Sequence, residues 1–244
     1  MIKANALTTY QLKLMMLVAM VIDHVAWAFV PTESLAGELM HTIGRMVAPM
    51  MAYFLAMGFA KSRDVMRYLG RLFGFAVMSQ PVFMWFQYQI GTVDAIGDVM
   101  WGNVLFSLGT ALLALMLWQS RLDKWLKLLA MLPLMLLADL SEYGMAMILW
   151  AMIFDRLRLH KAQMLIVYLL SLPIAYILIY GINITAGLGV MHFGMALSAA
   201  LIALHNGQQG RAIPLWLGGR YLFYGFYPVH LAVIAWIVSY VDCC

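Results

Sequence analysis

The sequence predicts an all-α membrane protein, a polytopic bundle of about nine transmembrane helices forming a single domain over residues 1–244. Two observations lead to this prediction. Hydrophobic residues make up 65% of the chain and charged residues 11%, with a mean hydropathy of +0.87, whereas soluble domains are about half apolar and about a quarter charged. Apolar runs close to the ~20 residues that cross a bilayer also recur along the whole chain.

Each apolar run is a candidate span, because a helix in lipid satisfies all of its backbone hydrogen bonds internally. Polar or basic connections separate the runs, and the fifth and sixth runs are shorter than the others. In chain order the nine candidates are residues 11–30, 42–60, 67–88, 101–118, 125–138, 143–155, 163–180, 190–205 and 221–240.

The connections between these spans alternate in charge. The basic ones contain Lys61, Arg63, Arg67 and Arg71, then Arg121, Lys124 and Lys127, then Arg156, Arg158, His160 and Lys161, and finally Arg211 and Arg220. The intervening connections contain Glu33 and Glu38, Asp94 and Asp98, and Asp139 and Glu142. Because Lys and Arg favour the cytoplasmic side of a membrane, we expect a cytoplasmic N-terminus and a C-terminus on the outer side.

The cysteine content indicates neither a disulfide framework nor a zinc site. The chain has two cysteines, Cys243 and Cys244, which are adjacent in the sequence, and no Cys–His spacing typical of zinc ligands occurs. The lipid bilayer is an expected partner, whereas no metal ion and no nucleic acid is expected.

Two polar residues interrupt the first candidate span, where each of them costs free energy. Asp23 and His24 lie in its outer half under the predicted orientation, at the level of His41 and Arg45 near the start of the second span. Other spans contribute polar residues to the same half, namely Gln80, Asn103, Glu142, Tyr143 and His192. Ionisable groups within a membrane usually face the bundle interior or a wet cavity and mark function, so we expect these side chains to form one site.

Helix geometry restricts how these residues can pair. Successive residues of an α-helix point about 100° apart, so Asp23 and His24 do not face each other. We expect His24 to meet a partner from another helix and Asp23 to hold Arg45 or a backbone group. His41 and Arg45 are four residues apart and share one helix face.

Purely structural roles are alternatives for several of these residues. An acid paired with an Arg or a His inside a membrane can simply fasten helices together, and Gln80 and Asn103 can bridge helices through hydrogen bonds. His41, at the edge of a loop, can be an ordinary interfacial histidine. The last span fits an interfacial aromatic belt that grades into packing, and His230 within it receives no catalytic role.

Six short motifs follow one another in an order that is typical of one protein family. They are MVIDHVAW, IGRMVAPMMAYFLAMGF, RYLGRLFGFAVMSQPVF, GNVLFSLG, ADLSEYGMAMIL and RYLFYGFYPVHLAVI, and together they extend over nearly the full length. The chain thereby resembles the TraX family, which is known for acetylating the N-terminus of conjugative pilin. One departure is Glu142, where the family pattern has Asp before Tyr-Gly; the carboxylate is kept with a longer reach.

The resemblance implies a multi-pass acetyltransferase of the bacterial inner membrane. Such an enzyme moves an acetyl group from cytoplasmic acetyl-CoA to an acceptor on the outer side, here the N-terminal amine of a pilin subunit. TraX proteins also look similar to wider transmembrane acyltransferases, in which an intramembrane histidine acts on acyl-CoA. By that resemblance His24 takes the catalytic role, with Asp23 as its sequence neighbour.

The residue types fit the chemistry of acetyl transfer from a thioester. His24 is suited to be the base that deprotonates the acceptor, because imidazole titrates near neutral pH. Asp23 or Glu142 is expected to stabilise the resulting imidazolium. Arg45, Asn103 or Gln80 is expected to hold the oxyanion, with His41 and Tyr143 as further substrate-positioning candidates.

The phosphates of CoA require cationic groups on the cytoplasmic side. Arg67 and Arg71 share one helix face and are the first candidates, with Arg63 and Lys61 beside them. The preference of basic residues for the cytoplasm is a sufficient explanation for any single one of them. No glycine-rich phosphate loop of known spacing is present.

Other functions remain open at this point. An O-acetyltransferase of surface polysaccharide needs the same groups, and acetyl transfer can be direct or pass through a covalent histidine intermediate. A proton-coupled transporter can use intramembrane Asp, His and Arg equally well, although the repeated halves frequent in transporters are not evident. A structural or assembly protein would not need a cluster of acids and bases.

Overall fold

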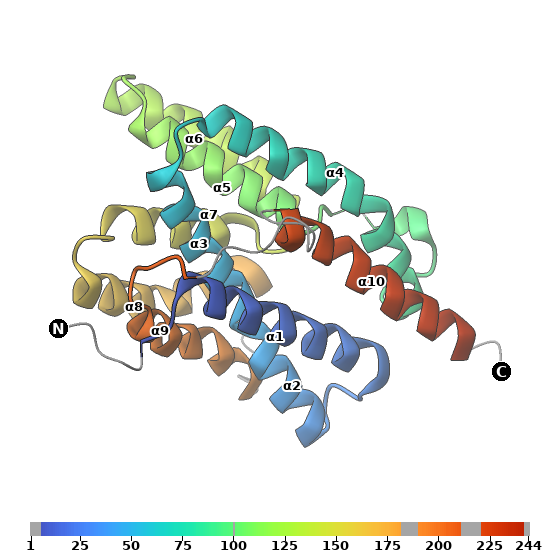
Figure 1. Ribbon diagram of the computed structural model, residues 1–244. Coiled ribbons are helices and arrows are strands. Elements are labelled where there is room, and N and C mark those ends of the chain that lie inside the picture. The colour runs from blue at the N-terminus through green and yellow to red at the C-terminus, as the bar shows by residue number, and fades with distance from the viewer. Residues whose placement is uncertain (1–5, 100, 182–189, 211–220, 242–244) are drawn as a thin grey trace. The chain divides into compact units, whose positions relative to one another are not determined.

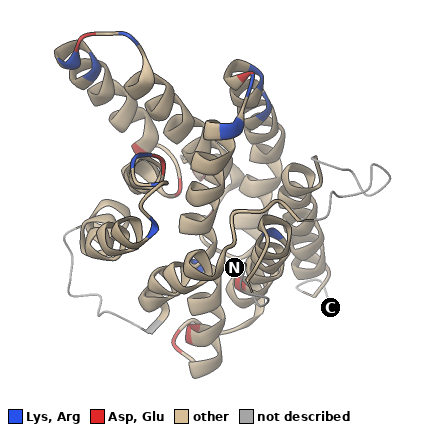
Figure 2. Cartoon of the chain, turned by 60° about the vertical axis from the view of Figure 1, so that its left-hand side comes forward, with Lys and Arg blue, Asp and Glu red and all other residues tan. Residues whose placement is uncertain are grey.

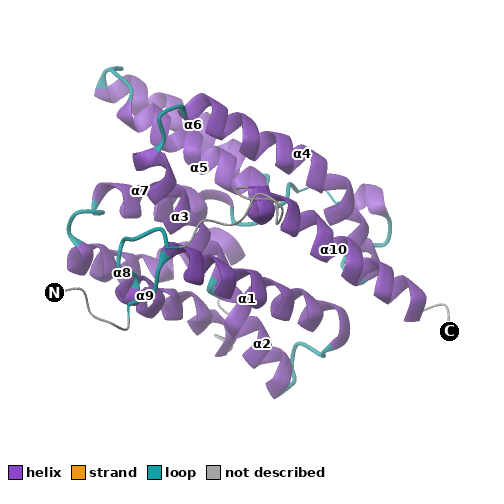
Figure 3. Cartoon of the chain, viewed as in Figure 1, coloured by secondary structure: helices purple, strands orange, loops and turns teal. Residues whose placement is uncertain are grey.

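The computed structural model describes residues 6–99, 101–181, 190–210 and 221–241 (Figure 1). These ranges are helical apart from turns and short loops, and they contain no strand (Figure 3). Two isolated backbone bridges, Leu7 with His205 and Gly102 with Ser141, lie outside the helices. The prediction of an all-α protein is confirmed.

All nine predicted spans coincide with helical structure in the described ranges. In order the elements are α1 (Thr9–Phe29), α2 (Leu35–Arg45), α3 (Val47–Lys61), α4 (Val65–Gln89), η1 (Ile96–Asp98), α5 (Val104–Gln119), α6 (Lys124–Asp139), α7 (Gly144–Arg156), α8 (Lys161–Tyr180), η3 (Val190–Phe193), α9 (Gly194–Leu204) and α10 (Leu222–Val241). The second span begins earlier than predicted. Ser34 caps α2, because its Oγ accepts a hydrogen bond of 3.0 Å from the Gly37 N–H and so satisfies a backbone donor that the helix start leaves unpaired.

Four helical segments of the described ranges are long and apolar enough to cross a membrane. They are Thr9–Phe29, Leu35–Lys61, Lys161–Tyr180 and Leu222–Val241. The apolar helices Val104–Gln119 and Met191–Leu204 are shorter. These helices fit a membrane protein, while the count of nine crossings and the cytoplasmic N-terminus stay predictions.

Large apolar side chains point outward from several of these helices. Leu170 on α8 is 72% exposed, Val18 on α1 is 60% exposed and Trp236 on α10 is 62% exposed. Isolated exposed apolar residues are ordinary in soluble proteins, but here they line helices with hardly any charged residue. Contact with lipid is the environment that fits these faces.

The helices pack as two compact units. Unit 1 comprises Met1–Val47, Pro81–Val99 and Leu188–Cys244, and unit 2 comprises Ala48–Gln80 and Met100–Gly187. The boundary falls after the first residue of α3 and again within α4, so the chain passes between the two units several times. The single domain stays a prediction.

Unit 1 brings α1 and α10, the first and last helices of the described ranges, into contact. Lys13 Nζ on α1 lies 4.9 Å from the centre of the Phe223 ring on α10, and the rings of His24 and His230 are 4.9 Å apart, so the two helices run in the same direction. α2 packs against α1 and runs the opposite way, because His41 lies beside Trp27 whereas Gly44, farther along α2, lies beside Asp23, earlier on α1. These relative directions agree with the alternation that the charge pattern predicts.

The start of α1 is tied to the chain that follows α9. Leu7 N–H donates to the Leu204 carbonyl at 2.9 Å, and Thr9 N–H donates to the Gln208 carbonyl at 2.9 Å. Thr9 Oγ1 also lies 3.0 Å from Nε2 of His205. The end of α9 therefore lies at the same end of unit 1 as the beginning of α1, again as the alternation predicts.

In unit 2 the basic turns lie at one end of the helices. Gln119 Nε2 at the end of α5 donates to Asp155 Oδ2 near the end of α7 at 3.0 Å, so these two helix ends are adjacent. α4 runs antiparallel to α5, because Phe73 packs at Gly109 whereas Asn103, just before α5, bonds to Ala76 and Gln80 farther along α4. Most of the Lys and Arg positions accordingly lie at helix ends and turns (Figure 2). Arg211 and Arg220, together with Cys243 and Cys244, lie outside the described residues.

Candidate functional site

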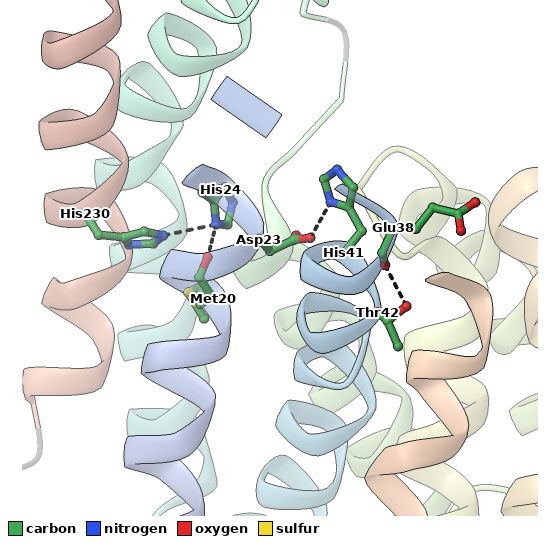
Figure 4. Close-up of polar contacts among 7 residues, drawn as sticks. All are labelled: Met20, Asp23, His24, Glu38, His41, Thr42 and His230. Carbon is green, nitrogen blue, oxygen red and sulfur yellow. Dashed lines mark hydrogen bonds and ion pairs between the residues drawn. The ribbon is translucent and has the colours of Figure 1, made fainter. Parts of the chain in front are cut away.

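Asp23 on α1 pairs with a histidine of α2. The Nδ1–H of His41 donates to Oδ1 of Asp23 at 2.8 Å (Figure 4). His41 has no exposed surface, and the Asp23 side chain is 13% exposed. A carboxylate that holds Nδ1–H fixes both the tautomer and the orientation of the ring, and leaves Nε2 as an acceptor.

A glycine makes this pairing possible. A Cβ atom built on Gly44 would overlap the carboxyl group of Asp23, so only glycine lets α2 approach α1 this closely. Gly194, at the start of α9, has the same function against α2, where a Cβ would overlap the Thr42 carbonyl. Helix interfaces in membranes commonly use small residues in this way.

An aromatic ring and a cation lie beside the pair. The Trp27 and His41 rings are 4.5 Å apart with an interplanar angle of 50°, and the Arg45 guanidinium is 5.9 Å from the centre of the Trp27 ring. Nε2 of His41 is buried and has no hydrogen-bond partner among the residues that the structure describes. That acceptor is unsatisfied among the described residues, and the surrounding side chains leave it no exposed surface.

His24 faces a different side of α1. Its Nδ1 lies 2.7 Å from the carbonyl oxygen of Met20 and 3.3 Å from Nε2 of His230 on α10. The Phe86 ring packs edge-on to it at 5.3 Å. Because a carbonyl can only accept, the neutral His24 ring has its proton on Nδ1, and no described residue forms a hydrogen bond with its Nε2.

The structure therefore separates the two neighbouring polar residues of the first span. As predicted, they do not form a dyad, and His24 meets a partner from another helix. The prediction that Asp23 holds Arg45 or a backbone group is wrong, because the carboxylate bonds to His41. The description of His41 as an interfacial histidine at a loop edge is also wrong: it lies within α2 and is fully buried.

His230 is the site residue that the sequence analysis missed. It is 6% exposed and contacts His24 directly, whereas an interfacial belt predicted only packing. The position of His230 along the last span is the signal that could have identified it as a partner of His24. If the first and last spans both run outward from the cytoplasm, His24 and His230 fall at similar levels of the membrane.

Gln80 and Asn103 form a network of their own within unit 2. The Asn103 side chain donates to Gln80 Oε1 at 2.8 Å and to the Ala76 carbonyl at 2.9 Å, and its Oδ1 accepts from the Leu105 N–H as the N-cap of α5. Gln80 Nε2 donates to the Trp101 carbonyl at 3.0 Å. These bonds fasten α4 to the start of α5, the structural alternative considered for both residues.

Glu142 and Tyr143 also belong to unit 2, at the turn before α7. Their backbone N–H groups donate to the Gly102 carbonyl and to Ser107 Oγ, at 3.1 Å and 3.3 Å. The turn is thereby fixed to the start of α5. His192 lies in η3, which packs against α2 in unit 1. That all these residues join His24 in one site stays a prediction.

The four residues predicted to bind CoA lie where α3 ends and α4 begins. Arg67 Nε is 3.3 Å from Asp64 Oδ2, both side chains being largely in solvent, and the Arg71 guanidinium lies 5.7 Å from the centre of the Tyr68 ring. Lys61 and Arg63 are exposed. All four are accessible to an anionic ligand, and their role as its binding site stays a prediction.

Acid–base chemistry is what the unit 1 cluster can perform. This cluster contains one carboxylate, three imidazoles and one guanidinium. They belong to Asp23 and His24 on α1, His41 and Arg45 on α2, and His230 on α10. Within the described ranges no three His, Cys, Asp or Glu side chains are placed to share a metal ion. Nε2 of His24, on a half-buried ring, is the acceptor best placed for a substrate, while Nε2 of His41 is fully buried.

Comparison with known proteins agrees with the motifs of the sequence. A family profile described as TraX protein matches residues 8–239. The chain is 34% identical over 233 residues to the probable fimbrial assembly protein FimC, serogroup H1, of Dichelobacter nodosus, covering 93% of this chain and 94% of that protein. No solved structure matches the chain. Because the family match extends over nearly the whole sequence, the chain belongs to the TraX family.

Proposed function

We propose that the protein is a membrane-embedded acetyltransferase that acts in pilus assembly. It transfers the acetyl group of cytoplasmic acetyl-CoA to an amine on the outer side of the bacterial inner membrane, in the first place the N-terminal amine of a pilin subunit. Three findings support the proposal: membership of the TraX family, a relative named for fimbrial assembly, and an acid–base cluster among apolar helices.

The observation on which the proposal chiefly depends is the state of His24. Its Nδ1–H is bonded to the Met20 carbonyl, which leaves the lone pair of Nε2 for a substrate proton. Nε2 takes a proton from the attacking amine while the nitrogen forms a bond to the acetyl carbon. The carbon–sulfur bond then breaks, and the imidazolium returns the proton to the CoA thiolate. General-base assistance of this kind contributes about 10²–10⁴-fold to a rate.

The negative charge that develops on the carbonyl oxygen needs a donor. Arg45 is the candidate that the proposal retains, because it lies in unit 1 beside Trp27, which is on the same helix as His24. The Asn103 side chain already donates to Gln80 Oε1 and to the Ala76 carbonyl, and Gln80 Nε2 already donates to the Trp101 carbonyl. His41, whose buried Nε2 has no partner among the described residues, is suited to receive an N–H group of the acceptor.

The basic residues where α3 ends and α4 begins in unit 2 are proposed to bind the phosphates of CoA. Arg67 and Arg71 lie one helical turn apart on α4, and Lys61 and Arg63 precede them. Guanidinium groups suit phosphate because their planar donors match its oxygens. The ion pair of Arg67 with Asp64 is largely exposed, so it costs little to exchange for a phosphate.

The experiment follows the acetyl group. Purified protein in lipid nanodiscs is supplied with radiolabelled acetyl-CoA and a short peptide with a free N-terminal amine, and the labelled peptide is counted. We expect His24→Ala to lower transfer at least about 100-fold without changing the melting temperature. His160→Ala, an exposed histidine before α8, is the matched control and should keep full activity.

Two comparison acceptors distinguish the enzyme alternatives. The same peptide with a blocked amine should not be labelled, and labelling of an oligosaccharide in preference to the peptide would favour O-acetylation of surface polysaccharide. A folded His24→Ala protein with undiminished transfer would overturn the mechanism. Failure of the unchanged protein to bind acetyl-CoA would overturn the whole proposal and favour proton-coupled transport.

A further inference from the structure

The contact between His24 and His230 joins the first and last helices of unit 1. The two ring centres are 4.9 Å apart at an interplanar angle of 74°, and Nε2 of His230 is 3.3 Å from Nδ1 of His24 (Figure 4). His230 is 6% exposed. A second imidazole thus approaches the proposed base from the side opposite to its open nitrogen.

The positions of the protons follow from the neighbouring carbonyls. Nδ1 of His230 lies 2.8 Å from the Phe226 carbonyl, four residues earlier on α10, just as Nδ1 of His24 lies 2.7 Å from that of Met20. Both neutral rings therefore have their proton on Nδ1. Nε2 of His230 is then an acceptor, and the His24 Nδ1–H is shared between this nitrogen and the Met20 carbonyl.

The His230 ring is itself held in place. The Phe226 ring stacks on it at 5.1 Å and 14°, and the Tyr227 ring packs against it at 5.9 Å. Together with the bond to the Phe226 carbonyl, these contacts restrict the rotation of the imidazole. The acceptor that it presents to His24 is consequently preorganised.

A catalytic histidine needs such an acceptor at the nitrogen that does not react. After taking a proton at Nε2 the ring is a cation, and in many enzymes a carboxylate bonded to Nδ1–H keeps the ring in position and stabilises that charge. Asp23, the nearest carboxylate in the sequence, is bonded to His41 instead. Among the described residues, the acceptors at Nδ1 of His24 are both neutral, namely the Met20 carbonyl and His230.

We propose that His230 is the positioning residue of His24, accepting its Nδ1–H and so keeping Nε2 directed at the acceptor substrate. This inference rests on the proposed acetyl transfer by His24. It assigns a role to the histidine of the YPVHL segment, and it explains why a polar side chain occupies a buried place on an otherwise apolar face of α10.

Two substitutions separate positioning from space-filling. His230→Phe keeps a flat ring of similar size but removes the acceptor, whereas His230→Gln offers an amide oxygen at about the reach of Nε2. Val233→Ala, at an exposed position of α10, is the control for general disturbance of the helix. Acetyl transfer is measured at varied acetyl-CoA and peptide concentrations, together with the melting temperature.

For His230→Phe we expect kcat to fall at least about tenfold with KM for acetyl-CoA unchanged, because a loosely held base mainly affects the chemical step. His230→Gln should recover most of that loss, and Val233→Ala should resemble the unchanged protein. The inference is overturned if His230→Phe keeps kcat within about twofold, or if His230→Gln is as slow as His230→Phe.

A spectroscopic measurement keeps the inference testable without catalysis. With ¹⁵N-labelled histidine, the ring nitrogen shifts of His24 report which nitrogen has the proton, and the His24→Ala protein assigns the signals. We expect the Nδ1–H form in the unchanged protein and in His230→Gln, and a mixture with the Nε2–H form in His230→Phe. If the unchanged protein transfers no acetyl group, the proposed function fails. An unaltered tautomer in His230→Phe would instead show that the Met20 carbonyl alone fixes the ring, and would overturn the role of His230.

Discussion

The Nδ1 atom of His41 lies 2.8 Å from Oδ1 of Asp23, across the contact between α1 and α2. The pair is almost entirely removed from solvent, since His41 has no exposed surface and Asp23 keeps 13%. Breaking it leaves one polar group buried without its partner, which costs more than the bond itself contributes. The pair thus stabilises the helix contact that also places His24 in unit 1.

Removal of either partner should destabilise the protein. We expect Asp23→Ala and His41→Ala each to lower the free energy of unfolding by about 2–4 kcal/mol. The double variant should lose less than the sum of the two, by about 1–3 kcal/mol, because the two groups interact directly. Denaturant unfolding in detergent, followed by tryptophan fluorescence, measures all four proteins. Strict additivity would show that the two side chains do not interact.

Gly44 should not tolerate a larger residue, because a Cβ atom there would overlap the Asp23 carboxyl. We expect Gly44→Ala to lower stability by about 1–3 kcal/mol through forced displacement of α1 from α2. Gly70→Ala on α4 is the matched control, since a Cβ there meets nothing within 4 Å. It should stabilise by up to about 1 kcal/mol through helix propensity. Equal effects of the two changes would contradict the close approach.

Asn103 is expected to be more than a helix cap. Asn103→Ala removes the cap of α5 together with the side-chain hydrogen bonds to Gln80 Oε1 and to the Ala76 carbonyl, so the melting temperature should fall by the equivalent of about 2–4 kcal/mol. Asp123→Ala removes only an exposed cap, at the start of α6, and should cost about 1 kcal/mol. A similar loss in both variants would mean that the link from α4 to α5 contributes nothing.

The helices of the chain were predictable because lipid imposes strong rules on sequence. A span needs a long apolar run, and the charge of each connection follows the side of the membrane. The same alternation placed Asp23 and His41 at one level, which made their contact possible to foresee. Asn103 was likewise predicted at the start of its helix, and it is the N-cap of α5.

The pairing of side chains was less predictable, because it depends on the rotation of each helix about its axis. Asp23 and His24 are neighbours, yet one faces α2 and the other α10. Nothing in the spacing of the sequence states that the first and last helices are in contact, so His230 had no predicted partner. Gly44 was visible in the sequence, but its function requires knowledge of which side chain it faces.

Reversing charge where α4 begins should weaken the binding of acetyl-CoA and leave the chemical step intact. Arg67 and Arg71 lie on one face of α4 in unit 2, close to the exposed Lys61 and Arg63, and they take no part in the unit 1 cluster. We expect the Arg67→Glu, Arg71→Glu double variant to raise KM for acetyl-CoA about tenfold or more, because repulsion replaces attraction to the phosphates. Arg121→Glu, an exposed charge of the turn before α6, is the control and should change KM little.

Raising salt from 0.05 M to 0.5 M should increase KM of the unchanged protein and affect the double variant less, since salt screens exposed charges. A double variant with unchanged KM would place the CoA phosphates elsewhere, while a fall in kcat at saturating acetyl-CoA would show that these arginines act on the chemistry instead.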